Sequence, residues 1–474
     1  MTEYDPRKII CTCARVTCGD VADAVAAGAK TVAEVRERTR ATAFCGSCTQ
    51  RIEDFVNLLL SGEAVPKAEE PKEAPSDAVL SATTWRQVSQ DIYWVGGCSR
   101  SNPWFEKQYP APQGMAYNCY LLLDRYTVLF DTVDPAVSEP FLRNVEALLD
   151  GRPLNYLIIS HMEPDHASNI AEILRRWPKC QAVCTAGAKK MLEQFFGPEL
   201  SARAQDIRDG VSVLMGKHIL SFHLAPMVHW PEVMVTYDRT SETLFSADAF
   251  GTFGDLDGAL FHDQGDFPME EYRRYYTNIV GKYGGPVQQL MAKAAKLQIA
   301  RICPLHGPVW RRDLNVILDK YQKWSTYVPE ETGVTIAYAS IYGHTEQACR
   351  ILADKLTQKG VSAKLVDLSR VHHSYALAEA FRRSHLVLGS VTWNGGLFPD
   401  MEHFISSLTS HGLKNRTVGL IENGSWAPMA ARKMTEQLGN SMTVLPEKVT
   451  ILSALKQSQH AQLDALAEAI VKTI

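Results

Sequence analysis

Long hydrophobic segments are missing from this sequence of 474 residues. Its longest apolar runs, such as 127–130 and 156–159, have the length of a buried strand, whereas a transmembrane helix needs roughly 20 apolar residues. The first residues also lack the apolar core of a signal peptide, because Ile9 and Ile10 are followed directly by cysteine. These absences predict a protein without a membrane span that stays in the cytoplasm.

An excess of charge of either sign is missing as well. The formal net charge is −4, which gives no reason to expect binding to nucleic acid or to a membrane surface. Apolar residues make up 46% of the chain and charged residues 22%, a balance typical of globular proteins. The chain is too long for one ordinary core, so we expect two to four domains.

Cysteine, by contrast, is plentiful and unevenly placed. Five of the eleven cysteines lie within the first 48 residues. In a reducing compartment such clustering indicates metal ligation more than disulfides. The other six are scattered singly among apolar neighbours, and we expect them to be buried as small hydrophobic side chains. These six are Cys98, Cys119, Cys180, Cys184, Cys303 and Cys349.

The composition divides the chain at two places. Residues 62–76 combine three prolines with interleaved lysine and glutamate, which predicts an extended and mobile linker. A second boundary lies near 327–333, where Pro329-Glu-Glu-Thr-Gly precedes a new apolar strand. The predicted parts are a small module at 1–61, a flexible linker at 62–79, a middle domain at 80–328 and a last domain at 329–474.

The three parts have different secondary-structure patterns. Helical sequence lies at 20–27 and 31–39 of the N-terminal module, and the middle domain has many short β-rich runs. The last domain alternates strand and helix regularly, which predicts an α/β doubly wound parallel sheet. Its expected strands are 334–339, 363–366, 386–389, 417–421 and 443–445, and its expected helices are 346–358, 401–410, 429–438 and 459–474.

The N-terminal cysteines form two close pairs, Cys11-x-Cys13 and Cys45-Gly-Ser-Cys48, with Cys18 outside the pattern. Thiolates are soft ligands, and four of them suit an iron–sulfur cluster or tetrahedral zinc. The Cys-x-Cys pair is tighter than the Cys-x-x-Cys of most zinc sites, which favours iron–sulfur over structural zinc or no metal. At all four cysteines the pattern resembles the [2Fe–2S] domain of bacterioferritin-associated ferredoxins. The resemblance implies a [2Fe–2S] cluster in a small helical module.

A dense group of possible metal ligands follows the expected strand 154–160. It reads His161-Met-Glu163-Pro-Asp165-His166. Such a group on a loop at a strand end is placed to build a site on a rigid scaffold. Three further candidates, His229, Asp248 and His306, occur in similar contexts after apolar segments.

The order of these ligands resembles that of the metallo-β-lactamase fold, an αββα sandwich in which a short motif and later His, Asp and His bind two metals. Zinc hydrolases of this fold carry histidine where this chain has Glu163. The extra carboxylate makes the site harder and more anionic, which favours iron. This substitution is the signature of flavodiiron proteins, which the chain resembles over nearly its whole length. The alternative is a structural or hydrolytic zinc site.

That resemblance implies a di-iron site with a specific set of ligands. One iron would be held by His161, Glu163 and His229, and the other by Asp165, His166 and His306, with Asp248 as the bridge. The chain departs from the family in one place. Members often have a Phe-His-Gly-Tyr-like run that lines the substrate pocket, but here residues 104–109 read Trp-Phe-Glu-Lys-Gln-Tyr, without histidine.

Three loops of the last domain resemble the FMN site of flavodoxins. They follow the expected strands that end at 339, 389 and 421, and the first offers hydroxyl groups and backbone N–H groups to a phosphate at a helix N-terminus. Tryptophans in the other two can stack on the flavin ring. The alternative is a flavin-free domain of the same fold. The FMN-binding residues implied are Ser340, Ile341, Tyr342, Gly343, His344, Thr345, Thr392, Trp393, Asn394, Gly395, Gly396, Asn423, Gly424, Ser425 and Trp426.

Together these resemblances imply an oxidoreductase that passes electrons from a donor through [2Fe–2S] and FMN to the di-iron site. We expect reduction of O2 to water, with reduction of NO to N2O as the alternative. A metal hydrolase has no use for FMN, and a simple electron carrier does not need seven ordered ligands. The sequence has no rubredoxin-like cysteine pairs near its end and no NAD-binding fingerprint there or in the last domain. A separate reductase, ferredoxin or rubredoxin is therefore expected as donor. The family also implies a head-to-tail homodimer or a dimer of dimers.

Overall fold

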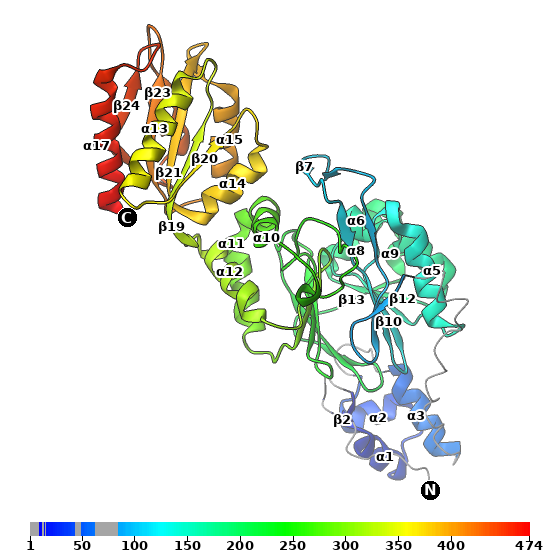
Figure 1. The fold of residues 1–474 in the computed structure, drawn as a ribbon. Coiled ribbons are helices and arrows are strands. Elements are labelled where there is room, and N and C mark those ends of the chain that lie inside the picture. Colours follow the sequence, from blue (N-terminus) through cyan, green and yellow to red (C-terminus); the bar gives the residue numbers. More distant parts are fainter. Residues whose placement is uncertain (1–8, 12–13, 15, 43–48, 62–83) are drawn as a thin grey trace.

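The computed structural model describes residues 9–11, 14, 16–42, 49–61 and 84–474. Figure 1 shows a small helical module at the N-terminal end, a central domain of two sheets and an α/β domain at the C-terminal end. Cys13, Cys45, Cys48 and the predicted linker at 62–79 lie outside the described residues.

The N-terminal module is a short two-stranded sheet followed by helices. Its elements are β1 (Ile9–Cys11), β2 (Val16–Thr17), α1 (Cys18–Ala26), α2 (Val32–Thr39) and α3 (Thr49–Ser61). Both α1 and α2 begin with a capping box, formed by Thr17 with Asp20 and by Thr31 with Glu34. These caps satisfy backbone N–H groups at the helix N-termini that would otherwise be unpaired. The caps therefore help segments as short as α1 and α2 to form helices.

The first sheet of the central domain has seven strands in the order β13-β12-β11-β10-β9-β4-β3. Strands β10 to β13 are parallel, and β9 runs antiparallel to β10. The strands are β3 (Arg86–Gln87), β4 (Ile92–Trp94), β9 (Tyr120–Leu123), β10 (Thr127–Phe130), β11 (Tyr156–Ile158), β12 (Gln181–Cys184) and β13 (Ala204–Asp206).

The second sheet has five strands in the order β14-β15-β16-β17-β18. They are β14 (Ser212–Leu214), β15 (Ile219–Leu224), β16 (Met234–Asp238), β17 (Thr243–Phe245) and β18 (Arg301–Cys303). The two sheets pack through buried apolar side chains such as Phe130 and Phe245, whose rings stack with centroids 3.8 Å apart.

Helices cover the outer face of each sheet of the central domain. The first sheet packs against α5 (Ser138–Leu149), α7 (Ile170–Arg176) and α8 (Ala186–Phe196), which α9 (Pro198–Ala202) follows. The second sheet packs against α10 (Met269–Tyr275), α11 (Gly284–Ala294) and α12 (Leu314–Thr326). Each helix buries one apolar face, so the layers stack as helix, sheet, sheet and helix. The predicted αββα sandwich is confirmed.

The C-terminal domain is the predicted doubly wound parallel sheet, with strand order β20-β19-β21-β23-β24. Its strands are β19 (Glu331–Tyr338), β20 (Ala363–Asp367), β21 (Arg383–Trp393), β23 (Thr417–Asn423) and β24 (Thr443–Ile451). Its helices are α13 (His344–Gln358), α14 (His373–Arg382), α15 (Pro399–Ser410), α16 (Ala430–Leu438) and α17 (Gln457–Thr473). Helix α14 was not among the helices expected from the sequence, although a parallel pair such as β19 and β21 needs a crossover connection.

The amino ends of the C-terminal strands face the central domain. Arg382, just before β21, lies 3.5 Å from Glu270 of α10. Arg416, just before β23, donates from Nη1 to the carbonyl oxygen of Tyr327 at 2.7 Å. Because the strands are parallel, their carboxyl ends all lie at the opposite edge, turned away from the central domain (Figure 1).

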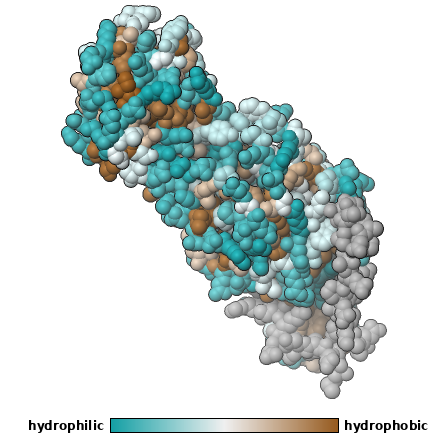
Figure 2. Space-filling view, in the orientation of Figure 1, coloured by the Kyte–Doolittle hydropathy of each residue, from teal (hydrophilic) through white to brown (hydrophobic). Residues whose placement is uncertain are grey.

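The surface is mostly hydrophilic on the face drawn in Figure 2, and hydrophobic residues gather mainly on the C-terminal domain. Among the described helices, none is both long and apolar enough to span a bilayer. Of the six scattered cysteines, five are buried as expected, but Cys98 is exposed. It lies on β5 (Gly97–Ser99), which pairs only with β8 (Met115–Tyr117), so its outward face has no covering layer.

A buried histidine links the two sheets of the central domain. His218 places Nδ1 2.7 Å from Asp238 and Nε2 3.2 Å from Asp91. Burial alone would lower its pKa, but the two carboxylates outweigh burial and raise the pKa of His218 above the usual value. This charged histidine stabilises the fold below the ordinary histidine pKa of about 6.5, and its contribution is lost as the pH rises through the raised pKa.

We therefore expect His218→Gln to lower the urea midpoint of the central domain most at about pH 6 and less at about pH 9. His223 on β15, the strand that begins directly after His218, is the control, because burial lowers the pKa of His223. His223→Gln is expected to show the opposite trend with pH. Equal losses at both pH values in His218→Gln would contradict the ion-pair account.

Candidate metal centre

The predicted ligands converge at one rim of the central domain, between the two sheets. His161 and Glu163 follow β11, and the short helix α6 (Pro164–Ala167) carries Asp165 and His166. From the second sheet, His229 follows β15, Asp248 follows β17 and His306 follows β18. The ligand atoms of these seven residues form two groups, and within each group they lie within 4.8 Å of one another.

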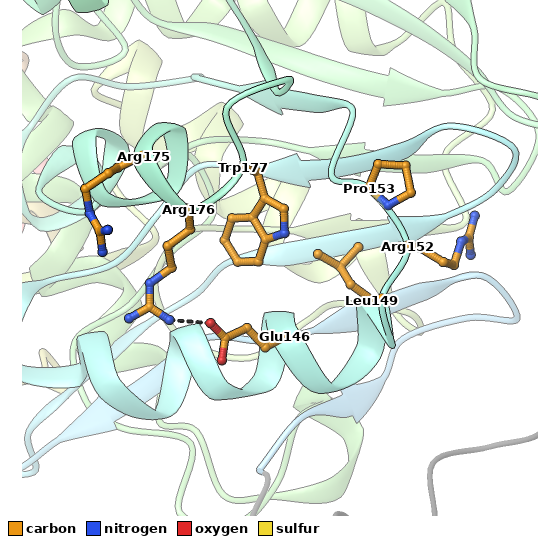
Figure 3. Close-up of a pocket in the computed structure, with 8 residues that line it drawn as sticks. Glu146, Leu149, Arg152, Pro153, Arg175, Arg176 and Trp177 are labelled. Atoms are coloured by element: carbon orange, nitrogen blue, oxygen red, sulfur yellow. Dashed lines mark hydrogen bonds and ion pairs between the residues drawn. The ribbon is translucent and has the colours of Figure 1, made fainter.

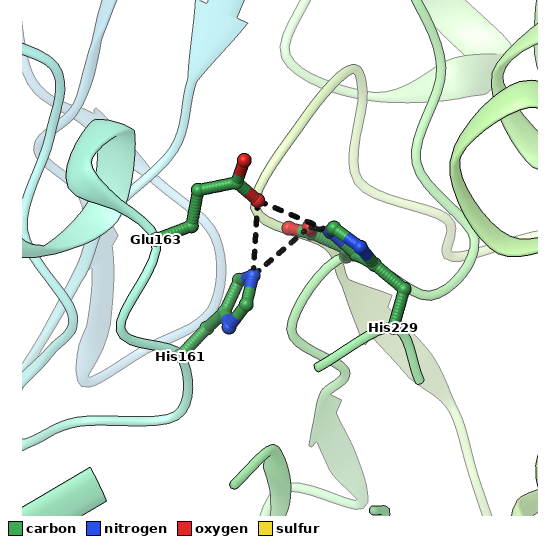
Figure 4. A group of neighbouring side chains, drawn as sticks. His161, Glu163 and His229 are labelled. Atoms are coloured by element: carbon green, nitrogen blue, oxygen red, sulfur yellow. Dashed lines mark hydrogen bonds and ion pairs between the residues drawn. The ribbon is translucent and has the colours of Figure 1, made fainter. Parts of the chain in front are cut away.

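The first group consists of His161, Glu163, His229 and Asp248. Figure 4 shows the side chains of His161, Glu163 and His229 pointing toward one another. Glu163 Oε2 lies 3.2 Å from His161 Nε2 and 3.1 Å from His229 Nε2. Donor atoms from three separate loops therefore surround one small volume, which is the geometry that a metal ion needs.

The second group consists of Asp165, His166 and His306. The Nε2 atoms of the two histidines are 3.0 Å apart, and both lie near Asp165 Oδ2, at 3.4 Å and 3.2 Å. Two imidazole nitrogens that face each other this closely do not stabilise one another unless a proton or a cation lies between them. His166 thus lies among the other predicted ligands.

Asp248 lies between the two groups. Its Oδ2 is 3.1 Å from His229 Nε2, and its Oδ1 is 3.3 Å from His166 Nε2. One carboxylate therefore offers one oxygen to each group, as a bridging ligand does.

The chemistry of the donors fits two iron ions. Both Asp165 oxygens and Asp248 Oδ1 are buried and have no hydrogen-bond partner among the described residues. Buried carboxylate oxygens are costly to leave unpaired, so a cation is the missing partner. Four imidazoles with three carboxylates form a mixed nitrogen and oxygen set, which is compatible with iron.

Burial and neighbouring charges act in opposite directions on the pKa values of the ligand side chains. Burial favours neutral imidazole, but the nearby carboxylates outweigh it and raise the pKa of His166 and of His229 to about 9. Burial also acts against ionised Asp248, yet the neighbouring imidazoles of His166 and His229 hold its pKa well below the usual value. Metal binding would displace the imidazole protons, so affinity should fall as the pH is lowered.

Residues outside the predicted set hold the ligands in place. Asp131 Oδ1 accepts hydrogen bonds from the backbone N–H groups of Ser160, at 2.6 Å, and His161, at 3.3 Å. His306 Nδ1 lies 2.8 Å from the carbonyl oxygen of Ala116, which directs Nε2 into the site. The sequence signal for Asp131 is a carboxylate directly after the apolar strand 127–130, the same context as that of the predicted ligands.

Aromatic rings wall the centre. Phe105, Tyr117 and Tyr275 pack on His306 with ring centroids 5.3 to 5.7 Å away. On the other side, Trp230 meets His161 edge to face at 5.2 Å. These rings border His306 and His161 with apolar surface.

The segment 104–109, which differs from the family pattern, forms a hairpin that reaches the metal centre. It joins β6 (Trp104–Phe105) to β7 (Tyr109–Pro110), and its turn residues Glu106 and Lys107 both have positive φ, 51° and 56°. Although Glu106 is exposed at the hairpin tip, its carboxyl group faces Glu163. Burial of the carboxyl group, followed by the Glu163 charge, raises the pKa of Glu106 to about 8. A carboxyl group thus stands near the place where the family often has histidine.

The first predicted flavin loop has the features of a phosphate site. Ser340 Oγ accepts a hydrogen bond from the N–H of Gly343 at 3.1 Å, and Gly343 is left-handed with φ 86° at the start of α13. The Oγ1 of Thr345 is buried in the first turn and has no hydrogen-bond partner among the described residues. A phosphate at this helix N-terminus would supply that partner.

The other two flavin loops lie beside the first, because β19, β21 and β23 are neighbours in the sheet. Trp393 and Trp426 are 44% and 92% exposed, which leaves their rings available for stacking. Thr392 has a structural contact, since its Oγ1 accepts from the N–H groups of Met429 and Ala430. Asn423 likewise donates to the Ser453 carbonyl oxygen and braces the third loop.

Of the predicted cluster ligands, the structure describes Cys11. It is buried on β1, in the small core of the N-terminal module. Arg51 of α3 donates to the carbonyl oxygen of Leu214 on β14 and so anchors this module to the second sheet of the central domain.

A separate pocket lies between α5 and α7 (Figure 3). It shares no residue with the metal centre. Its arginines are already engaged, since Arg175 and Arg176 pair with Glu172 and Arg176 also pairs with Glu146. The third arginine of the lining, Arg152, donates a hydrogen bond to the carbonyl oxygen of Asp124. Its lining consists of Glu146, Leu149, Gly151, Arg152, Pro153, Arg175, Arg176 and Trp177.

Comparison with family profiles gives three matches in order along the chain. Residues 9–57 match the BFD-like [2Fe-2S] binding domain, 115–307 the ODP family beta lactamase and 336–466 flavodoxin. The nitric oxide reductase of Moorella thermoacetica is 30% identical over 357 residues, which cover 74% of this chain and 88% of that relative. The chain belongs to the flavodiiron protein family.

Other relatives of this flavodiiron protein agree with that assignment. The anaerobic nitric oxide reductase flavorubredoxin of Aeromonas hydrophila is 29% identical over 363 residues, covering 74% of this chain and 72% of the relative. Two solved structures share the fold. Rubredoxin oxygen:oxidoreductase from Desulfovibrio gigas has a TM-score of 0.78 at 24% identity and covers 82% of this chain and 98% of its own. The flavodiiron protein from Giardia intestinalis has a TM-score of 0.75 at 21% identity, and the match covers 82% of this chain and 97% of the Giardia chain.

These matches confirm the predicted fold class and the predicted oxidoreductase class. They also confirm the cofactors, because the three domains are those that hold a [2Fe–2S] cluster, FMN and two irons in this family. Which residues hold each cofactor, and where each domain begins and ends, stay predictions.

Proposed function

We propose that this flavodiiron protein reduces nitric oxide to N2O at the di-iron centre. Two NO molecules, two electrons and two protons give N2O and water. The single observation that carries the proposal is the pair of ligand groups that share Asp248, because adjacent metals can hold two small molecules side by side. The choice of NO is supported by relatives named as nitric oxide reductases at 29% and 30% identity.

In this proposal, His161, Glu163 and His229 hold one iron, and Asp165, His166 and His306 hold the other. When bound, the two irons supply electrons and sites for the gas. The chain's own residues would hold these ions, with Asp248 offering one oxygen to each ligand group, and the aromatic rings border both groups. Glu106 stands at the open side of Glu163, where a carboxyl group can hold or deliver a proton to the reacting gas.

Reduction of O2 to water is the second candidate and was the first expectation from the sequence. It is favoured by the same ligand set, and a solved structure of this fold is named rubredoxin oxygen:oxidoreductase. That structure is only 24% identical, so it bears on the fold rather than on the choice of gas.

The two candidates make opposite predictions for gas preference. With one reductant and equal gas concentrations, we expect a higher kcat/KM for NO, measured by N2O formation, than for O2, measured by its consumption. A kcat/KM for O2 that exceeds the value for NO would reverse the assignment. Glu106→Gln, tested with both gases, shows whether the carboxyl group sets the preference. Asp209→Asn, which changes an exposed carboxylate of the central domain, provides the control.

We also propose that the active unit forms between two chains. The FMN loops lie at the edge of the C-terminal sheet that faces away from its own central domain (Figure 1). A flavin bound there by Ser340, Thr345 and Trp393 would be far from the metal centre of the same chain. A head-to-tail dimer, alone or within a dimer of dimers, would bring it to the metal centre of the second chain.

The N-terminal module, with Cys11, Cys13, Cys45 and Cys48 as cluster ligands, is proposed to receive electrons from a separate reductase, ferredoxin or rubredoxin. Deleting residues 1–61 should slow turnover with that protein donor and spare turnover with small reductants that reach FMN directly. The core of the central domain does not include this module, so folding should survive the deletion. Equal loss with both kinds of reductant would contradict this role, as would a colourless, zinc-loaded fragment 1–61.

A further inference from the structure

Glu232 is a buried carboxylate behind the first group of ligands. It follows Trp230-Pro231, between His229 and β16, and its side chain is fully buried. Its Oε1 lies 2.8 Å from His161 Nδ1 and accepts a hydrogen bond from the N–H of Met162 at 2.9 Å. Its Oε2 is buried without a hydrogen-bond partner in the part of the chain that the structure describes.

The surroundings of Glu232 hold it rigidly. Thr185, the N-cap of α8, donates from Oγ1 to the Glu232 carbonyl oxygen at 2.8 Å. Gly187 in the first turn of α8 packs so closely that an added Cβ would lie 3.1 Å from the Cβ of Glu232. Among the described residues, Glu232 forms its ion pair with His161. A buried carboxylate without a lysine or arginine partner is costly, so its position points to a role at the ligand.

The hydrogen-bond pattern fixes the tautomer of His161. Because a carboxylate only accepts, His161 must donate from Nδ1, which leaves the lone pair of Nε2 directed at the metal position. The corresponding atom of His306 donates instead to the neutral carbonyl oxygen of Ala116. The histidines of the two metal positions therefore differ, since one has an anionic partner and the other an uncharged one.

We infer that Glu232 is a positioning residue that makes His161 the stronger electron donor and so makes the two irons inequivalent. This inference rests on the proposed ligand assignment. An anionic partner increases the donor strength of an imidazole, which stabilises the oxidised over the reduced metal. The iron held by His161 should then have a lower reduction potential than the iron held by His306.

The test uses Glu232→Gln in the full-length holoprotein. Glutamine keeps the size and can still accept from Met162 and His161, but it removes the charge. We expect a higher reduction potential for one iron couple in a redox titration followed by electron paramagnetic resonance, with the FMN and [2Fe–2S] potentials unchanged. Iron affinity, measured against a competing chelator, should fall by about 10-fold to 100-fold.

Two further variants separate tuning from folding. Glu232→Asp keeps the charge and should retain the low potential even where affinity falls. Glu172→Gln, which removes an exposed carboxylate on α7 of the same domain, should change neither quantity. The inference would be overturned if the reduction potential of the iron couple were the same in the native protein and in Glu232→Gln. It would also be overturned if Glu232→Asp raised this potential as much as Glu232→Gln does.

The same affinity measurement keeps this inference distinct from the proposed function. If the native site takes zinc in place of iron, the gas-reductase proposal fails. A 10-fold or larger loss of zinc affinity in Glu232→Gln would still support the positioning role of Glu232, and an unchanged zinc affinity would overturn it.

Discussion

Asp248→Ala is expected to abolish gas reduction while FMN stays bound. Asp248 gives one oxygen to each ligand group, so its loss leaves His166 and His229 without the carboxylate that they share. Loss of an outer partner of a ligand typically costs 10-fold to 100-fold in metal affinity or activity, and loss of a bridging ligand should exceed about 100-fold. Iron content and N2O formation measure the effect, and flavin absorbance reports FMN.

A matched control is available in the same domain. Asp209 forms an exposed ion pair with Lys293 at 3.0 Å. Exposed pairs contribute about 1 kcal/mol or less, so Asp209→Ala should keep iron, FMN and turnover. An Asp248→Ala protein that retains both irons and more than a tenth of the native rate would contradict the bridging role.

Mixing two inactive variants is expected to restore activity if FMN serves the metal centre of the second chain. One variant lacks FMN binding through replacement of Thr345 and Trp393, and the other is Asp248→Ala. After joint unfolding and reassembly, half of randomly formed dimers are mixed, and each mixed dimer has one complete unit out of two. Activity should therefore reach about a quarter of the native value.

The outcome depends on demonstrating that mixed dimers form, for example with two affinity tags used in series. Each variant reassembled alone should stay inactive, which shows that neither variant retains activity of its own. Mixed dimers that are isolated, hold FMN and iron, and remain inactive would place electron transfer within one chain. In that case the head-to-tail arrangement would be wrong.

The metal ligands could be predicted because each belongs to a short segment after an apolar strand. His161, Glu163, Asp165 and His166 lie together in the sequence, and parallel strands bring their ends to a shared edge. The C-terminal sheet was predictable for a related reason, since regular alternation of strands and helices permits few topologies. Both predictions rest on local sequence patterns, and the roles of the ligands stay predictions.

The residues that hold the ligands could not be predicted in the same way. Glu232 is 71 positions from His161, and in the sequence it is one acidic residue among many. Its role comes from complete burial, which only packing reveals. Glu106 had a sequence signal, the missing histidine at 104–109, but its approach to Glu163 depends on a turn with two left-handed residues. A contact between two single side chains that are far apart in the sequence produces no periodic pattern, so the sequence alone does not reveal it.

The central claim is that the site at the rim of the two sheets holds two irons, and metal analysis tests it most directly. Iron and zinc should be counted in the purified full-length protein and in the protein that lacks residues 1–61. We predict about four irons per chain in the first, from one [2Fe–2S] cluster and one di-iron site, and about two in the second. Stoichiometric zinc in the shortened protein, together with full gas-reducing activity, would contradict the account.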